Sequence, residues 1–165
     1  MTSLSVIIAS AGRPCLGIAI GSVVGQLRPG DELLVDINED SPWGHRARNR
    51  MMPRARADAL VFLDDDDVYV PGALEIIRSY YGQMPDRMHI FRMRQPDGSL
   101  LWSHAGLALG NVSTQMICVP NGSFGQWNER AYEGDWHFIQ STAQKLGTEP
   151  LFHQELISLH NATAA

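Results

Sequence analysis

A short apolar stretch, residues 60–63, runs directly into four consecutive aspartates, residues 64–67. β-Branched and aromatic residues in a run of this length are typical of a buried strand. Pro71 and Gly72 follow, and Pro71 is suited to the first position of a helix that begins near Ala73. The aspartates are therefore expected where a strand gives way to a loop. In an open α/β sheet, ligands bind at that edge.

Four adjacent carboxylates repel one another, and at a sheet edge they lose part of the water that would screen them. A hard divalent cation such as magnesium or manganese, which prefers oxygen ligands, would relieve that repulsion. The alternative is a solvated acidic turn that caps the following helix, because carboxylates favour a helix N-terminus. The apolar strand directly before the aspartates favours the metal site.

The first half of the chain alternates predicted strands and helices. Residues 4–9 and 32–36 have the apolar character of buried strands. Helices are predicted from about Pro14 and over residues 45–57. Together with residues 60–63 they give a β-α-β-α-β order. That order predicts a parallel sheet with right-handed crossovers.

The second half predicts additions to this sheet. Residues 88–94 alternate like a strand, and a Gln-Pro-Asp-Gly-Ser turn leads from them into residues 100–102, which predicts an antiparallel hairpin. The expected fold is a single α/β domain over residues 1–165, with a mixed, mostly parallel sheet flanked by helices. The remaining predicted elements are a strand at 114–119, a helix at 135–146 and a strand at 156–159.

Composition bounds the class of protein. A chain of 165 residues with 44% hydrophobic and 19% charged residues is typical of one globular domain. No apolar run is long enough to span a bilayer, and the first residues lack the basic region of a signal peptide. Cys15 and Cys118 have no metal-ligand spacing and are expected to be reduced. These features predict a cytoplasmic protein without a membrane partner.

The net charge of −5 argues against a protein that grips nucleic acid over its whole surface, because phosphate binding relies on clustered lysine and arginine. A local basic patch exists, since five arginines fall within residues 46–56. This patch is either an exposed helix face or a source of phosphate contacts.

Four stretches together resemble a GT-A-fold glycosyltransferase, most closely glycosyltransferase family 2. Residues 5–9 with Arg13 resemble the family's opening strand and nucleotide-contacting turn, and residues 32–36 resemble its second strand. Residues 48–50, Arg-Asn-Arg, resemble its Arg-Asn motif. Residues 62–67, Phe-Leu-Asp-Asp-Asp-Asp, resemble its Phe-Leu-Asp-x-Asp-Asp, a form of the DXD metal motif. The match covers the first half of the chain well and the second half more loosely.

The resemblance implies a nucleotide-diphospho-sugar donor, UDP-linked, bound with Mn²⁺ or Mg²⁺. Asp67 is then the first expected metal ligand, and Asp66 is shared between the metal and the ribose. Asp64 contacts the nucleotide or caps the turn, and Asp65 occupies the variable position of the motif. The other implied nucleotide contacts are Ala9, Ser10, Arg13, Asp36 and Arg48.

Residues 132–136, Tyr-Glu-Gly-Asp-Trp, resemble the family's Glu-Asp element, in which the aspartate removes a proton from the acceptor hydroxyl. This sequence departs from the pattern by placing Gly134 between the two acids. Asp135 is therefore the expected base and Glu133 the reserve. The alternative role for Asp135 is that it only caps its helix.

In several relatives a histidine near the chain end completes the metal shell. His160, which follows the predicted strand at 156–159, is the expected counterpart, and His153 is its competitor. A lone histidine is otherwise more often structural. Residues 110–115 fall where the family has a donor-sugar segment. One of three tryptophans in this half is expected to stack on a sugar: Trp102, Trp127 or Trp136.

The expected function is therefore a metal-dependent transfer of a sugar to an acceptor hydroxyl, with inversion if Asp135 acts as the base. Residues 1–82 would bind the nucleotide and residues 83–165 the acceptor, which is a glycan, a protein or, less favourably, a DNA base. A homo-oligomer is an alternative to a monomer that the sequence does not decide.

Two rivals remain. A nucleotidyltransferase would show a glycine-rich, basic loop after the first strand, which residues 9–14 match poorly. The other is a catalytically inactive relative that binds a nucleotide-sugar or a glycan. Gly134 and the short chain are the features that favour this alternative.

Overall fold

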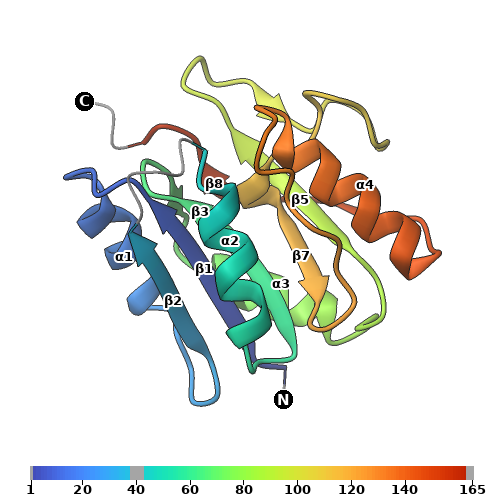
Figure 1. Ribbon diagram of the computed structural model, residues 1–165, viewed down its shortest axis with the longest axis horizontal. Coiled ribbons are helices and arrows are strands. Elements are labelled where there is room, and N and C mark those ends of the chain that lie inside the picture. Colours follow the sequence, from blue (N-terminus) through green and yellow to red (C-terminus); the bar gives the residue numbers. More distant parts are fainter. Residues whose placement is uncertain (1, 38–42, 163–165) are drawn as a thin grey trace.

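Strand β1 (Leu4–Ser10) lies between β2 (Glu32–Ile37) and β3 (Ala59–Asp64), and both pairings are parallel. Every residue of β1 is buried, as expected of a parallel strand with helices on both faces. The computed structural model describes residues 2–37 and 43–162 (Figure 1). The sequence also predicts a polar loop over residues 38–44, and residues 38–42 of it lie outside the described residues.

The described strands form one mixed sheet in the order β2-β1-β3-β7-β5-β8-β4, and β6 pairs with β5 beside this path. β7 runs antiparallel to both β3 and β5, and β5 with β6 forms the predicted hairpin. The longest ladders, β1 with β2, β1 with β3 and β5 with β8, are parallel. The prediction of a mixed, mostly parallel α/β sheet is confirmed. The later strands are β4 (Val68–Tyr69), β5 (His89–Arg94), β6 (Leu100–Leu101), β7 (Ile117–Pro120) and β8 (Leu151–Leu159).

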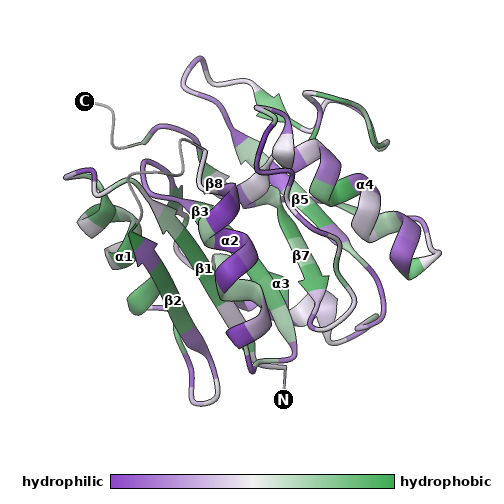
Figure 2. Ribbon diagram, in the orientation of Figure 1, coloured by the Kyte–Doolittle hydropathy of each residue, from purple (hydrophilic) through white to green (hydrophobic). Residues whose placement is uncertain are grey.

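Helices cover both faces of this sheet (Figure 1). Helices α2 (His45–Met51) and α4 (Gly134–Leu146) pack on one face. Helices α1 (Leu16–Val24) and α3 (Ala73–Tyr81) pack on the other. The central strands between these layers are hydrophobic along most of their length, whereas the connecting loops are largely hydrophilic (Figure 2). None of the described helices is long and apolar enough to cross a membrane.

Side chains of β1 and β3 alternate between the two faces, as the pleat of a strand requires. Ile7 and Phe62 point into the layer shared with α2 and α4, where the Phe138 ring packs edge-on with its centroid 5.3 Å from that of Phe62. Val6 and Val61 point into the layer shared with α1 and α3. Each of these side chains is fully buried. Burial of one such side chain contributes roughly 1.5–3 kcal/mol to stability.

Two helix boundaries differ from the prediction. Pro71 does not begin α3, because Gly72 follows it in a left-handed conformation, with φ of 84°, and the helix starts at Ala73. The helix predicted over residues 45–57 ends at Met51 and continues as a 3₁₀ turn (Met52–Arg54). Pro53 lies in this turn and has no N–H to continue the α-helical hydrogen bonding.

Two strand boundaries also differ. The strand predicted from residue 114 begins with a 3₁₀ turn (Thr114–Met116), and only β7 pairs in the sheet. The last strand starts at Leu151 rather than near residue 156, because its first part pairs with His89 and Ile90 of β5. This longer strand carries the chain to the edge of the sheet where the aspartates lie.

Candidate functional site

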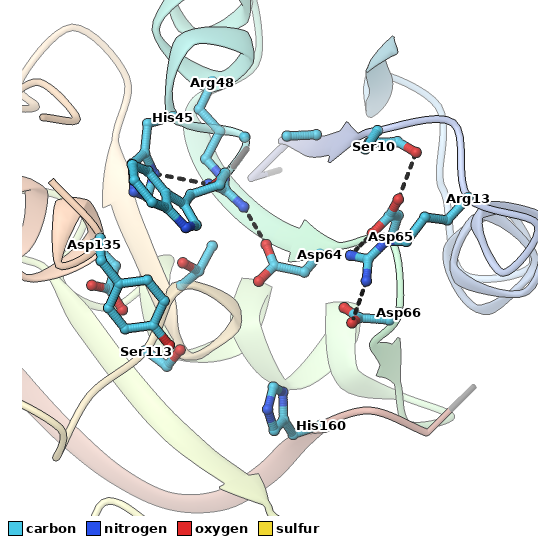
Figure 3. A pocket seen from close by; sticks show the side chains of 16 residues that line it. Ser10, Arg13, His45, Arg48, Asp64, Asp65, Asp66, Ser113, Asp135 and His160 are labelled. Atoms are coloured by element: carbon cyan, nitrogen blue, oxygen red, sulfur yellow. Dashed lines mark hydrogen bonds and ion pairs between the residues drawn. The ribbon is translucent and has the colours of Figure 1, made fainter. Parts of the chain in front are cut away.

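A cavity of about 610 Å³ opens at the carboxyl ends of β1 and β3 (Figure 3). The strand register explains its position, because Ala9 pairs with Asp36 on one side and with Asp64 on the other. The loops after these parallel strands therefore meet at one edge. The cavity is lined by these residues from the predicted site: Ala9, Ser10, Arg13, Arg48, Asp64, Asp65, Asp66, Asp135 and His160.

Arg48 holds Asp64 at the end of β3. The side chain of Arg48 is only 3% exposed, and its Nη2 forms an ion pair with Asp64. Its Nη1 donates to the carbonyl of Trp43 at 2.8 Å, and the guanidinium lies 4.7 Å from the centre of the Trp127 ring. A buried cation requires such partners to offset its lost hydration. Arg48 therefore fixes the position of the Asp64 carboxylate.

Arg13 joins the loop after β1 to the aspartates. It forms ion pairs with Asp65 and, at 2.8 Å, with Asp66 (Figure 3). Ser10 Oγ donates to the Asp65 carboxylate at 2.6 Å, so Asp65 is nearly buried between two partners. The hydrogen bond that Arg13 donates to the Asp65 carboxylate raises the pKa of Arg13 above its usual value. Arg13 remains half exposed and thus presents its charge to the cavity.

Asp67 lies behind the cavity wall rather than on its surface. Its Oδ1 accepts a hydrogen bond from the backbone N–H of Asn161 at 2.7 Å and lies 3.0 Å from His160 Nδ1. Its Oδ2 is buried and has no hydrogen-bond partner within the described residues. Burial raises the pKa of Asp67 to about 6, and the hydrogen bond to Asp67 raises the pKa of His160.

The residues at this end of the cavity have the chemistry of a divalent cation site. His160 lines the cavity while Asp67 contacts its Nδ1, and a carboxylate placed in this way orients a metal-binding imidazole. Asp66 presents its carboxylate to the same cavity. Residues 2–37 and 43–162 contain no cluster of three or more acidic, histidine or cysteine side chains arranged as metal ligands. The set fits Mg²⁺ or Mn²⁺ that takes further ligands from phosphate oxygens and water.

Asp135 faces the cavity from the first turn of α4, away from Arg13 and its aspartates (Figure 3). Burial raises the pKa of Asp135, and the charge of Asp64 raises it further. A carboxyl group with a raised pKa in a cavity is a candidate general base. Asp135 also accepts the backbone N–H of Trp136 at 2.7 Å, so it satisfies a first-turn donor as well.

Besides Asp67, the first predicted metal ligand, three predicted site residues lie outside this cavity. Glu133 precedes α4 with an exposed side chain and lines a neighbouring cavity instead. Asp36 accepts from Arg50 at 2.7 and 3.0 Å. His153 lies on β8, where its Nε2 is 2.9 Å from His89 Nδ1.

Part of the cavity wall was not predicted from the sequence. Trp43, His45 and Tyr132 form an aromatic edge, in which the Trp43 ring centroid is 6.1 Å from each of the other two. Only Tyr132 carried a sequence signal, because it begins the Tyr-Glu-Gly-Asp-Trp element. The segment predicted to contact the donor sugar contributes Ser113 and Thr114 to the wall.

No family model matches the sequence, and no curated protein matches it. Among solved structures, S. aureus TarS is similar at 12% sequence identity, with a TM-score of 0.73 over 97% of this chain and 36% of that chain. TarS 1–349 in complex with UDP-GlcNAc is similar at 13% identity, with a TM-score of 0.70 over 100% of this chain and 62% of that chain.

The complex of TarS 1–349 with UDP is similar at 11% identity, with a TM-score of 0.67 over 96% of this chain and 60% of that chain. This chain therefore spans 36% to 62% of the length of these three solved chains. At such low identity the likeness shows the fold alone. The chain adopts a GT-A-like Rossmann fold.

Proposed function

We propose that this protein is a glycosyltransferase that binds a nucleotide-diphospho-sugar, UDP-linked, in the cavity at the ends of β1 and β3. The observation that carries the proposal is the convergence of Arg13, Asp66, His160 and Asp135 on one cavity. Together they supply a cation for phosphates, two metal-ligand groups and a base. The solved TarS complexes with UDP-GlcNAc and UDP, which share this fold, support the choice of donor.

In this proposal the loops after β1 and β3 hold the donor. Arg13 is half exposed and contacts the diphosphate, and Asp64, held in place by Arg48, contacts the nucleoside. Asp66 and His160 would hold Mg²⁺ or Mn²⁺, and Asp67 contributes through its contact with His160. When bound, the cation supplies Lewis-acid stabilisation of the charge on the leaving diphosphate.

Asp135 acts as the base in the transfer step. It takes the proton of the acceptor hydroxyl as the acceptor oxygen bonds to the anomeric carbon and the bond from that carbon to the diphosphate oxygen breaks. A single displacement of this kind inverts the anomeric configuration. NMR of the product tests the step, and a product with retained configuration would contradict it.

Thermal unfolding with UDP, GDP, CDP or TDP, each with and without manganese, tests the donor site. We expect UDP with manganese to raise the melting temperature by roughly a few degrees. Asp66→Asn should abolish the rise, whereas Asp97→Asn, an exposed turn residue outside the cavity, should retain it. No rise with any of the four nucleotides would overturn the proposal.

The second candidate is a catalytically inactive binding module, which Gly134 between Glu133 and Asp135 favours. An inactive module that binds a nucleotide-sugar predicts the same thermal shift with UDP, whereas one that binds only a glycan predicts none. Release of UDP from a UDP-sugar in the presence of manganese separates them, because a binding module releases none.

A further inference from the structure

A second cavity, of about 370 Å³, adjoins the first. The two share Ser113, Tyr132, Asp135 and His160 as wall residues. A molecule in the second cavity therefore reaches the same Asp135 carboxylate as a donor in the first. If the proposed function holds, on which this inference rests, the second cavity is where the hydroxyl-bearing acceptor lies.

The walls of the second cavity are mainly apolar. Their apolar side chains are Met93, Leu101, Leu109, Val112, Tyr132 and Trp136. Of the three tryptophans considered for sugar contact, Trp102 and Trp127 are buried in the core, and Trp136 lines this cavity. Two apolar wall residues are strongly exposed, Leu109 at 63% and Tyr132 at 73%. An aromatic and aliphatic wall of this kind packs against the C–H face of a sugar ring.

The two cavities differ in their arginines. The first has Arg13 and Arg48 in its wall beside four aspartates, so it holds cationic groups that can contact a diphosphate. The wall of the second, as far as the chain is described, contains no lysine or arginine, and its carboxylates are Glu133 and Asp135. An acceptor that carried a phosphate or carboxylate here would be repelled by both acids, and in place of an arginine or lysine it would meet His160, which is paired with Asp67.

We infer that the second cavity binds an uncharged sugar as acceptor, with one face of its ring against the apolar wall and a hydroxyl toward Asp135. Anionic acceptors, including nucleic acid, are disfavoured by the two carboxylates of the wall. The two adjoining cavities thus separate an anionic donor from a neutral acceptor.

Titration with matched glycosides tests this directly, because it reads binding rather than turnover. The probes are 4-nitrophenyl β-D-glucoside and β-D-galactoside, each paired with the uronide that differs by one carboxylate. The readout is the indole N–H signal of Trp136 in NMR spectra, assigned among the four tryptophans with Trp136→Phe. We expect that signal to move with a neutral glycoside, and each uronide to bind about tenfold more weakly than its neutral partner.

Leu109→Arg adds a cation at the rim of the second cavity and should reduce the difference in binding affinity between neutral and anionic glycosides. Val24→Arg adds the same charge at an exposed apolar position of α1 outside both cavities, and should leave the difference unchanged. Failure of both neutral glycosides to move the Trp136 signal would overturn the inference. So would equal binding of the uronides, or no effect of Leu109→Arg.

The same samples distinguish this inference from the proposed function. A protein that responds to UDP by thermal shift but binds no neutral glycoside retains its donor site and lacks the acceptor cavity inferred here. A protein that binds neutral glycosides without responding to UDP contradicts the donor assignment instead.

Discussion

The imidazole of His45 occupies the space that a side chain at Gly134 would need. A Cβ atom at Gly134 would lie 2.3 Å from His45 Nε2 and 2.8 Å from the carbonyl oxygen of Asn128. The first turn of α4 therefore rests directly on the start of α2. This contact explains why a glycine separates Glu133 from Asp135 in this chain.

Gly134→Ala should displace that turn and the Asp135 carboxylate with it. We expect a loss of about 1–3 kcal/mol in the free energy of unfolding, measured by urea denaturation, because the added methyl overpacks a closed contact. His45→Ala in the same chain should recover part of the loss. Gly17→Ala is the matched control, since nothing lies within 4 Å of a Cβ at that helical position. Equal effects of the two alanines would contradict the contact.

Asp135 gives the proposed reaction a defined pH dependence. A base must be ionised, so kcat/KM for sugar transfer should rise with pH and level off above the pKa of Asp135. Burial raises that pKa, so the inflection should lie above the ordinary aspartate value of 3.8. The pH profile of kcat/KM measures it. A profile that is flat or falls across this range would contradict Asp135 as the base.

Substitution separates the two candidate bases. Asp135→Asn should lower kcat about 10²–10⁴-fold while the thermal shift with UDP persists. Glu133→Gln should lower kcat far less, because Glu133 lies outside the donor cavity. The reverse ranking of the two variants would assign the base to Glu133.

The contact between His89 and His153 predicts a loss of stability in acid. His89 Nε2 lies 2.9 Å from the carbonyl oxygen of Met84 and donates to it, so His89 Nδ1 accepts from His153. Burial lowers the pKa of both rings, that of His153 to about 4, although the charge of Glu155 opposes the shift. In the unfolded chain the two histidines each take up a proton near pH 6.5, whereas in the folded chain they do so only at lower pH.

The free energy of unfolding should therefore fall between pH 6.5 and about 4. For the half-buried His153 we expect about 1–2 kcal/mol of this fall, after allowance for solvent screening. His153→Gln, which does not titrate, should flatten the dependence measured by urea denaturation. His137→Gln, at an exposed position of α4, should not. A wild-type stability that is constant over this range would contradict the prediction.

Arg48→Met should destabilise the protein by about 3–5 kcal/mol, because it leaves Asp64 without its buried partner. Arg50→Met is the matched control on the same helix, and its ion pair with Asp36 is half exposed. We expect that change to cost less than about 1 kcal/mol. Thermal and urea unfolding of the two variants check the difference. Similar losses in both would show that burial of Arg48 does not strengthen its ion pair.

Sequence patterns predicted the parallel part of the fold well, because β1 and β3 are apolar on both faces. The resemblance to glycosyltransferase family 2 assigned Arg13, Asp66 and Asp135 to one site, and all three line the same cavity. The burial of Asp67 could not be predicted in this way. It depends on the pairing of Val68 with Leu159, which brings two distant segments into register.

Other features of the site depend on packing between distant side chains. The sequence did not indicate a role for His45, because that role depends on distant residues. Its ring stacks on that of Trp127, with the ring centroids 5.5 Å apart, and it packs against Gly134. The wrong start predicted for α3 has a local cause. Gly72 adopts a left-handed conformation, so the helix begins after it, at Ala73, and not at Pro71.

The pairing of β4 with β8 also fixes when the site can form during protein synthesis. A growing chain that ends at β7 contains the four aspartates but lacks both His160 and Asp135. The ribosome must release nearly the whole described sequence before Asp67 meets its partners. Until residues 159–161 emerge, Asp67 lacks its contacts with His160 and Asn161, so the acidic run reaches its final environment only after β8 has been made.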